Sequence, residues 1–179
     1  MKLPAKFGYL KQAPKLTLED GSTFTQSRGL SMYRHILIPT DGSELAEHGV
    51  TNGLSLAKSV GAKVTVIIVE EPFNWLGVSE SKAQWALEEL AKHTEQIKKH
   101  AASVLNRVAN TAKQAGVPCD TIRVEDEQPY KAIIAAAADR GCDLIVMASH
   151  GRSGLSAVVL GSVTNKVLTH TKTPVLVCH

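Results

Sequence analysis

The chain has 179 residues, of which 44% are hydrophobic and 21% charged, an ordinary composition for one globular domain with an ample core. No apolar run approaches the length of a membrane span, and residues 1–32 lack the apolar stretch of a secretory signal, so we expect a cytoplasmic protein that does not bind a membrane. The net charge of +3 is carried by residues 1–32, which leaves the remainder neutral, without the basic surface that nucleic-acid binding requires.

Residues 1–32 are expected to form an N-terminal extension. The segment is polar, contains prolines and glycines, and shows no sustained hydrophobic period. Such a composition is typical of an extended or disordered arm. The sequence therefore predicts one folded domain over residues 33–179.

From residue 33 onward the pattern alternates between short apolar runs and amphipathic segments. Strands are predicted at residues 35–38, 63–69, 120–125, 143–147 and 174–178, and helices at 43–59, 80–115, 129–140 and 160–169. Ser43 is a typical N-cap for the first helix, with Glu44 and Glu47 in its first turn, and Gly61 ends it.

The strands are apolar on both faces, which is typical of a parallel sheet covered by helices on its two sides. Right-handed crossovers then give an α/β fold with a doubly wound, open, five-stranded sheet. Ligands of such sheets bind beyond the carboxyl ends of the strands, where the strand order reverses. The turns after the first and fourth strands, which hold Asp41 and the 148–164 loop, are therefore the candidate site.

The 148–164 loop has the character of an anion site. It runs from the strand into Ala148-Ser149-His150-Gly151-Arg152 and leads to a helix near Gly161. Glycines let the backbone approach a phosphate, and the free N–H groups of a helix N-terminus attract anions. Arg152 can reach a phosphate, although an arginine in such a loop is more often simply solvated. A tight turn with an N-cap at Ser162 explains the same residues without a ligand.

Three separated segments resemble the universal stress protein family over residues 33–179. They are Ile36-Leu37-Ile38-Pro39-Thr40-Asp41-Gly42-Ser43, Met147-Ala148-Ser149-His150-Gly151-Arg152-Ser153-Gly154-Leu155 with Gly161-Ser162-Val163-Thr164, and Thr173-Pro174-Val175-Leu176-Val177. The resemblance implies a Rossmann-like, flavodoxin-like sheet with strand order 3-2-1-4-5. It also implies a homodimer formed partly through the last strand, and an adenine nucleotide as ligand.

The resemblance further implies where the nucleotide lies. Adenine is bordered by Pro39 and by the backbone of Val69, the ribose hydroxyls by Asp41, and the phosphates by the 148–164 loop. For Asp41 a helix-capping role remains the alternative. The implied cofactor-binding residues are Pro39, Thr40, Asp41, Val69, Met147, Ala148, Gly151, Arg152, Gly161, Ser162, Val163 and Thr164.

Ala148 departs from the family pattern. Members that bind ATP carry glycine, two residues, glycine, nine residues, then glycine with serine or threonine, and Ala148 occupies the first of these positions. If the position needs a positive φ, alanine strains it by about 1 kcal/mol. If it needs only a small side chain, the methyl group is either tolerated or crowds the nucleotide.

No catalytic machinery is visible in the sequence. It lacks the lysine-containing phosphate loop, a nucleophile elbow and histidines with metal-binding spacing, and no metal ligands are assigned. We therefore expect a stress-response protein that binds ATP, with Mg²⁺ as its companion ion, and regulates a dimer or an unidentified protein partner, with at most slow ATP hydrolysis. The alternatives are a dimeric interaction protein that does not bind ATP and, third, a nucleotide-dependent enzyme of a related α/β class.

Overall fold

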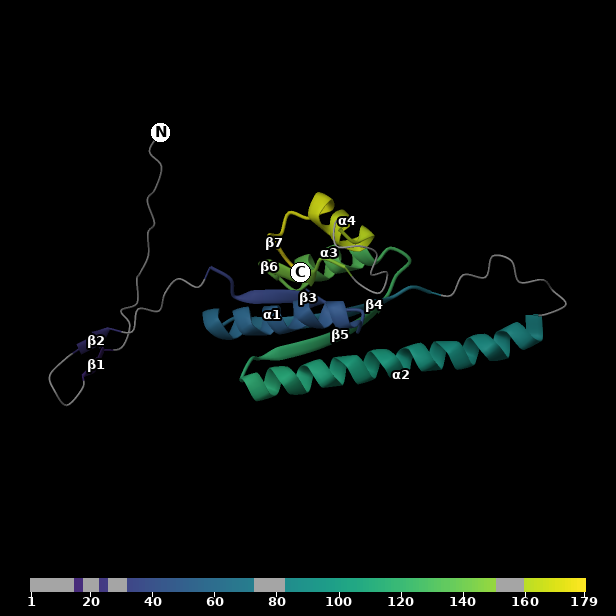
Figure 1. Ribbon diagram of the computed structural model, residues 1–179, viewed down its shortest axis with the longest axis horizontal. Helices are drawn as coiled ribbons and strands as arrows, with labels where there is room; N and C mark the ends of the chain where they lie inside the picture. Colours follow the sequence, from purple (N-terminus) through teal and green to yellow (C-terminus); the bar gives the residue numbers. More distant parts are fainter. Residues whose placement is uncertain (1–14, 18–22, 26–31, 73–82, 151–159) are drawn as a thin grey trace, which may run out of the picture. The chain divides into compact units, whose positions relative to one another are not determined.

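The computed structural model describes residues 15–17, 23–25, 32–72, 83–150 and 160–179 (Figure 1). The chain divides into two compact units, Met1–Ser31 and Met32–His179. In the first unit β1 (Lys15–Thr17) pairs antiparallel with β2 (Thr23–Thr25), two short strands that the sequence pattern did not reveal. That residues 1–32 act as an extension of a domain over 33–179 stays a prediction.

The second unit is an alternating α/β fold. Its elements are β3 (His35–Pro39), α1 (Glu44–Val60), β4 (Lys63–Glu70), α2 (Ala83–Ala115), β5 (Cys119–Glu125), α3 (Pro129–Asp139), β6 (Leu144–Ala148), α4 (Ser162–His170) and β7 (Val175–Cys178). All strand pairs of its five-stranded sheet are parallel, in the order β5-β4-β3-β6-β7. Counted from β3 this is 3-2-1-4-5, so the predicted fold class and strand order are confirmed.

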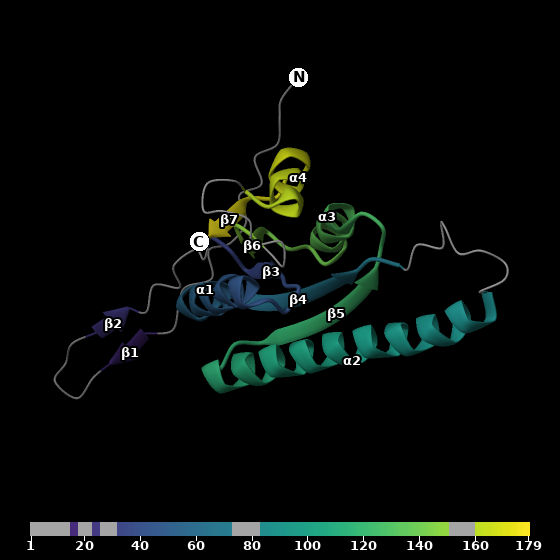
Figure 2. The same ribbon diagram turned by 45° about the vertical axis from the view of Figure 1, so that its right-hand side comes forward.

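Helices cover both faces of the sheet (Figure 2). Helices α1 and α2 pack on one face, where Ile36 and Ile38 of the central strand β3 lie in a core with apolar residues of both helices. Helices α3 and α4 lie on the other face, where Leu37 packs with Ile133 and Val167. Successive residues of β3 thus serve opposite cores, which explains why this strand is apolar without alternation.

The helix ends follow the sequence signals in most places. The Ser43 hydroxyl accepts a hydrogen bond from the Ala46 amide at 3.2 Å, and Gly61 ends α1 in the left-handed conformation at φ 69°, as predicted. The N-cap at Ser162, considered as the ligand-free alternative, is not formed. Gly161, which has no side chain, is the N-cap of α4, and Ser162 is the first residue of the helix.

Helix α2 is much longer than the strands of the sheet. Its 33 residues span about 50 Å, against about 26 Å for the eight residues of β4. Over residues 91–115, where the side chains of α2 are described, the buried apolar residues lie from Ala101 onward, and the N-terminal part of the helix runs past the carboxyl ends of the strands (Figure 1). Within the described ranges, no helix is long and apolar enough to cross a membrane.

Candidate functional site

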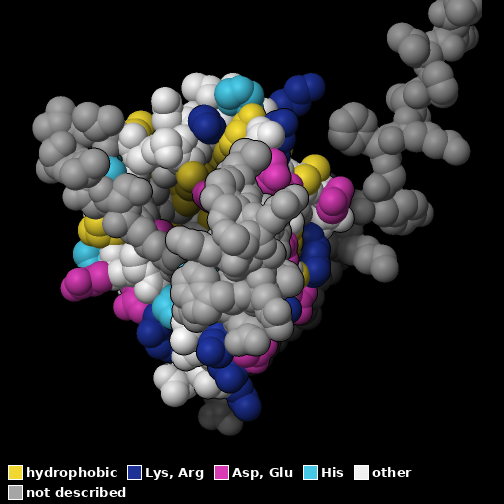
Figure 3. Space-filling model, turned by 90° about the vertical axis from the view of Figure 1, so that its right-hand side faces the viewer, with side chains coloured by type: hydrophobic (Ala, Val, Ile, Leu, Met, Phe, Trp, Pro, Cys, Tyr) yellow, Lys and Arg dark blue, Asp and Glu magenta, His cyan; other side chains and the backbone are white. Residues whose placement is uncertain are grey.

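The strand order reverses between β3 and β6, and the turns that follow these strands lie side by side. Ile36 pairs with Leu144 and Leu37 with Ile145, so both strands point their carboxyl ends to the same edge. A cavity of about 1320 Å³ opens at this edge. Figure 3 looks onto this side of the molecule, where acidic and histidine side chains reach the surface. This is the position at which doubly wound sheets bind ligands.

The cavity brings together most of the residues that the sequence singled out. Ten of them line it, namely Pro39, Thr40, Asp41, Val69, Met147, Ala148, Gly161, Ser162, Val163 and Thr164. The other two, Gly151 and Arg152, lie outside the described residues. Segments separated by more than a hundred residues in sequence therefore converge on one space.

The turn after β3 is held by its own polar groups. The Thr40 amide donates to the Ile67 carbonyl at 2.9 Å, and the Thr40 hydroxyl accepts from the Gly42 amide at 3.2 Å. Asp41 Oδ1 accepts from the Ser43 amide at 3.0 Å and from the Ser43 hydroxyl at 2.6 Å. Asp41 thus supports the capping residue of α1 and also lines the cavity, so the two roles considered for it are compatible.

The first turn of α4 is fixed to the end of β6. The Gly161 amide donates to the Ser149 carbonyl at 2.8 Å, and the buried Thr164 hydroxyl donates to the Ala148 carbonyl at 3.0 Å. A β-carbon on Gly161 would lie 3.2 Å from the Ser149 oxygen and 3.4 Å from His150 Cα, so glycine allows this close approach. Because the N-cap Gly161 has no side chain to cap them, the N–H groups of the first turn of α4 suit an anion.

Ala148 is the last residue of a regular strand. It pairs with Cys178 of β7, which places its backbone in the extended region, where alanine is unstrained. Positive-φ strain therefore does not arise at this residue. Its side chain borders the cavity but is only 8% exposed. The effect that Ala148 can still have on binding is steric, through the volume that its methyl group occupies beside a bound ligand.

The structure adds a wall that the sequence reasoning missed. Five residues of α2 line the cavity, namely His93, Gln96, Ile97, His100 and Ala101. Their spacing of three and four residues marks one face of the helix. That pattern was visible in the sequence, but it could not reveal that this stretch of α2 lies over the ends of the strands.

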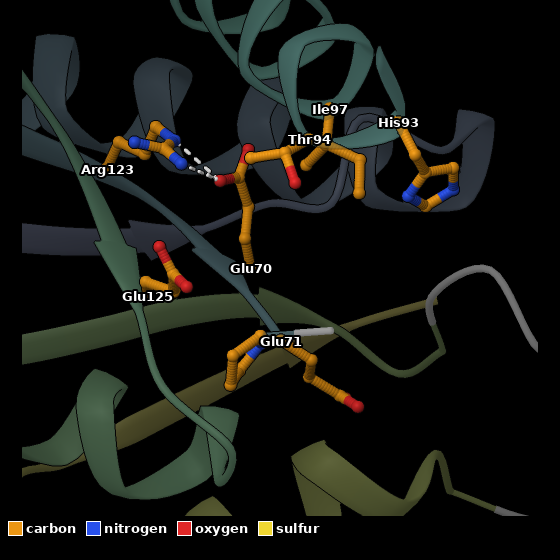
Figure 4. Close-up of a pocket in the computed structure, with 8 residues that line it drawn as sticks. Glu70, Glu71, His93, Thr94, Ile97, Arg123 and Glu125 are labelled. Atoms are coloured by element: carbon orange, nitrogen blue, oxygen red, sulfur yellow. Dashed lines mark hydrogen bonds and ion pairs between the residues drawn. The ribbon is translucent and has the colours of Figure 1, made fainter. Parts of the chain in front are cut away.

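Glu70 and Arg123 line a smaller, neighbouring cavity of about 250 Å³ (Figure 4). Arg123 Nε donates to Glu70 Oε2 at 2.5 Å, and its Nη2 also pairs with this oxygen. The hydrogen bond from Arg123 to Glu70 raises the pKa of the guanidinium. Among the described residues, Glu70 Oε1 is buried without a hydrogen-bond partner. Glu70 is thus fixed through one oxygen, between β5 and the Thr94 turn of α2.

Over the ranges that the structure describes, no group of three or more His, Cys, Asp or Glu side chains is arranged to hold a metal ion. The polar chemistry of the described site therefore comes from the turn after β3, the N-terminus of α4 and the polar face of α2.

Sequence comparison matches this architecture to known proteins. The profile of the universal stress protein family matches residues 32–179. Universal stress protein MJ0531 of Methanocaldococcus jannaschii is 32% identical over 149 residues, which cover 83% of this chain and 84% of that protein. The solved structure of MJ0577 from the same organism aligns with a TM-score of 0.67 and 28% identity, covering 82% of this chain and 95% of the other.

Two further solved structures of the same fold contain adenine nucleotides. A universal stress protein in complex with cAMP aligns with a TM-score of 0.59 at 23% identity, over 82% of this chain and 97% of the other. The Arabidopsis thaliana family protein At3g01520 with AMP bound aligns with a TM-score of 0.56 at 15% identity, over 80% and 90%. The profile match spans the whole second unit, and its sheet order agrees with the fold that the motifs imply. The chain therefore belongs to the universal stress protein family.

Proposed function

We propose that this chain binds an adenine nucleotide, with ATP and Mg²⁺ as the expected ligands, and acts as a nucleotide-regulated homodimer. The observation that carries the proposal is that the turn after β3, the end of β4 and the N-terminus of α4 all line the same cavity of about 1320 Å³. These three elements offer groups suited to a ribose, a base and phosphates in that order.

Each part of the nucleotide has a matching group. The N-terminus of α4, whose N-cap Gly161 has no side chain, suits the phosphates, because N–H groups and the helix dipole stabilise negative charge. A carboxylate such as Asp41 accepts hydrogen bonds from ribose hydroxyls. Pro39 and Val69 offer apolar surface, and the Val69 backbone offers hydrogen bonds, at the place expected for adenine. The complexes of relatives with cAMP and AMP support the same ligand class.

We infer a regulatory role for the bound nucleotide. A nucleotide can shift the state of a dimer or a partner surface only when it binds the two states with different affinity. For the dimer, the last strand β7 is the expected contact. Among the described strands it lies at the edge of the sheet and pairs with β6 alone, and its Leu176 is 43% exposed. Exposed edges of this kind readily pair with a second chain.

The proposal is tested by calorimetric titration of ATP with Mg²⁺ into nucleotide-stripped protein. We expect saturable binding. Asp41→Ala removes one charge-assisted hydrogen bond to the ligand, and Gly161→Ala obstructs one at the N-terminus of α4. Each variant is therefore expected to weaken ATP binding about tenfold. Asp126→Ala is the matched control. Its Oδ1 accepts from the Gln128 amide at 2.7 Å in an equivalent turn before α3, but Asp126 does not line the cavity.

The second candidate, a dimeric interaction protein without a nucleotide, is favoured by Ala148, whose methyl group stands where ATP-binding members carry glycine. The same titration separates the two functions. An absence of heat, together with an unchanged melting temperature at millimolar ATP, would favour the nucleotide-independent protein. Sedimentation velocity with and without ATP then measures whether the dimer forms and whether the nucleotide changes it.

A further inference from the structure

The α2 wall of the cavity has a chemistry different from that of the α4 end. Its described polar residues are His93, Gln96 and His100, and the neighbouring end of β4 adds the carboxylate of Glu71 together with Glu70, whose charge is paired with Arg123. Carboxylates repel phosphate and favour groups that donate hydrogen bonds. A nucleotide whose phosphates lie at α4 therefore presents its nucleoside part, and not its phosphates, to α2.

Contact between α2 and the turn after β3 fixes where this wall lies. Gly42 has φ +75°, and a β-carbon there would lie 2.7 Å from Val104 Cγ2 and 3.1 Å from His100 Nε2. The imidazole of His100 thus lies against the turn that carries Asp41. Gln96 lies about one helical turn nearer the N-terminus of α2 and also lines the cavity. Neither side chain is buried, and both border the cavity.

The size of the cavity allows a ligand to reach this wall. Its volume of about 1320 Å³ exceeds the usual range of about 300–1,000 Å³ for small-molecule sites. A ligand anchored at α4 can therefore extend across the ends of β3 and β4 to α2 without displacing the core.

We propose that His100 and Gln96 of α2 contact the sugar and the base of the nucleotide and determine which base the site prefers. The inference rests on the nucleotide-binding function proposed above. The His100 ring, beside Asp41, is placed to hydrogen-bond a ribose hydroxyl. The Gln96 amide offers both a donor and an acceptor, which matches the amino group and ring nitrogen on the edge of adenine. Guanine presents an oxygen in place of that amino group.

The test compares three alanine variants with the wild type by titration with ATP and with GTP. His100→Ala and Gln96→Ala are expected to weaken ATP binding about fivefold each, the value of one hydrogen bond. Gln96→Ala is also expected to reduce the preference for ATP over GTP by about threefold or more. Lys98→Ala is the matched control, because Lys98 is exposed on the same stretch of α2 but does not line the cavity.

The outcomes separate this inference from the proposed function. Wild-type protein that binds ATP, with both variants unchanged, overturns the role of α2 and leaves the nucleotide site in place. A wild type that binds ATP and GTP equally overturns the part of Gln96 in selectivity. A wild type that binds neither overturns the proposed function and the inference with it. A second readout is the NMR signal of the His100 ring, which is expected to shift when ATP is added and to stay in place if α2 is remote from the ligand.

Discussion

Two buried glycines of α1 let this helix lie directly on the sheet, and their substitution gives a sharp test of the packing. Gly49 and Gly53 are one helical turn apart on the buried face. A β-carbon on Gly49 would lie 2.8 Å from the Ala148 amide nitrogen and 3.2 Å from the Met147 carbonyl carbon. On Gly53 it would meet Ile38 Cδ1, the far end of a flexible side chain.

The kind of atom that the added β-carbon meets decides which of the two substitutions costs more stability. The backbone of β6 cannot move by a rotamer change, whereas the Ile38 side chain can. Overpacking a core costs about 1–3 kcal/mol, and replacing glycine by alanine inside a helix returns about 1 kcal/mol. Because the β6 backbone cannot give way, we take the upper part of that range, about 2–3 kcal/mol, and expect Gly49→Ala to lower the free energy of unfolding by about 1–2 kcal/mol net. Gly53→Ala is expected to lower it less.

The assay is urea unfolding followed by circular dichroism, with Asn52→Ala on the exposed face of α1 as control. The control is expected to stay within about 0.5 kcal/mol of the wild type. Gly49→Ala protein as stable as the wild type, or less destabilised than Gly53→Ala, would refute the reasoning. It would mean that α1 does not press on the backbone of β6 as the structure shows.

Three further predictions follow from single residues. Ala148→Gly is expected to change ATP affinity by less than about threefold, because the methyl group is almost fully covered, and to cost about 0.5–1 kcal/mol of stability through chain entropy; a gain of tenfold or more in calorimetric affinity would show that the methyl obstructs the ligand. Burial, reinforced by nearby Lys63, lowers the pKa of His35 below its ordinary 6.5, so its contribution to stability is complete above pH 6.5 and is lost as the pH falls through the lowered value. Urea unfolding between pH 7 and 5 should therefore show a steeper loss for wild type than for His35→Gln, and equal slopes would contradict the assignment. Burial, with the charge of Asp143, raises the pKa of Cys142 to about 11, so iodoacetamide at pH 8 should alkylate this thiol far more slowly in native than in urea-unfolded protein, as followed by mass spectrometry; equal rates would show that the thiol is accessible and ordinary.

The sequence predicted the layers of the fold because the central strands are buried on both faces. Residues 36–38 and 144–147 are apolar without alternation, and the structure places them on adjacent strands in the middle of the sheet. Local chemistry likewise fixed the start of α1 at Ser43 and its end at Gly61, since capping depends on a few neighbouring atoms.

Local signals were less reliable where tertiary contacts compete with them. Ser162 is a good capping residue by type, yet Gly161 occupies the N-cap because it must approach the Ser149 carbonyl closely. The effect of Ala148 could not be judged from the motif either. Its strand pairing with Cys178 decides that the backbone is extended, and pairing between distant segments is not encoded in either one alone.

For the candidate site, the sequence by itself determined which two loops converge, because the strand order of a doubly wound sheet brings the ends of the first and fourth strands together. It also supplied the turn with Asp41 and the α4 N-terminus with Gly161. Only the tertiary structure showed that α2 overhangs these ends and turns His100 and Gln96 toward the same cavity. The helical period specifies which residues share a face, but the position of that face over the sheet depends on packing between elements remote in the chain.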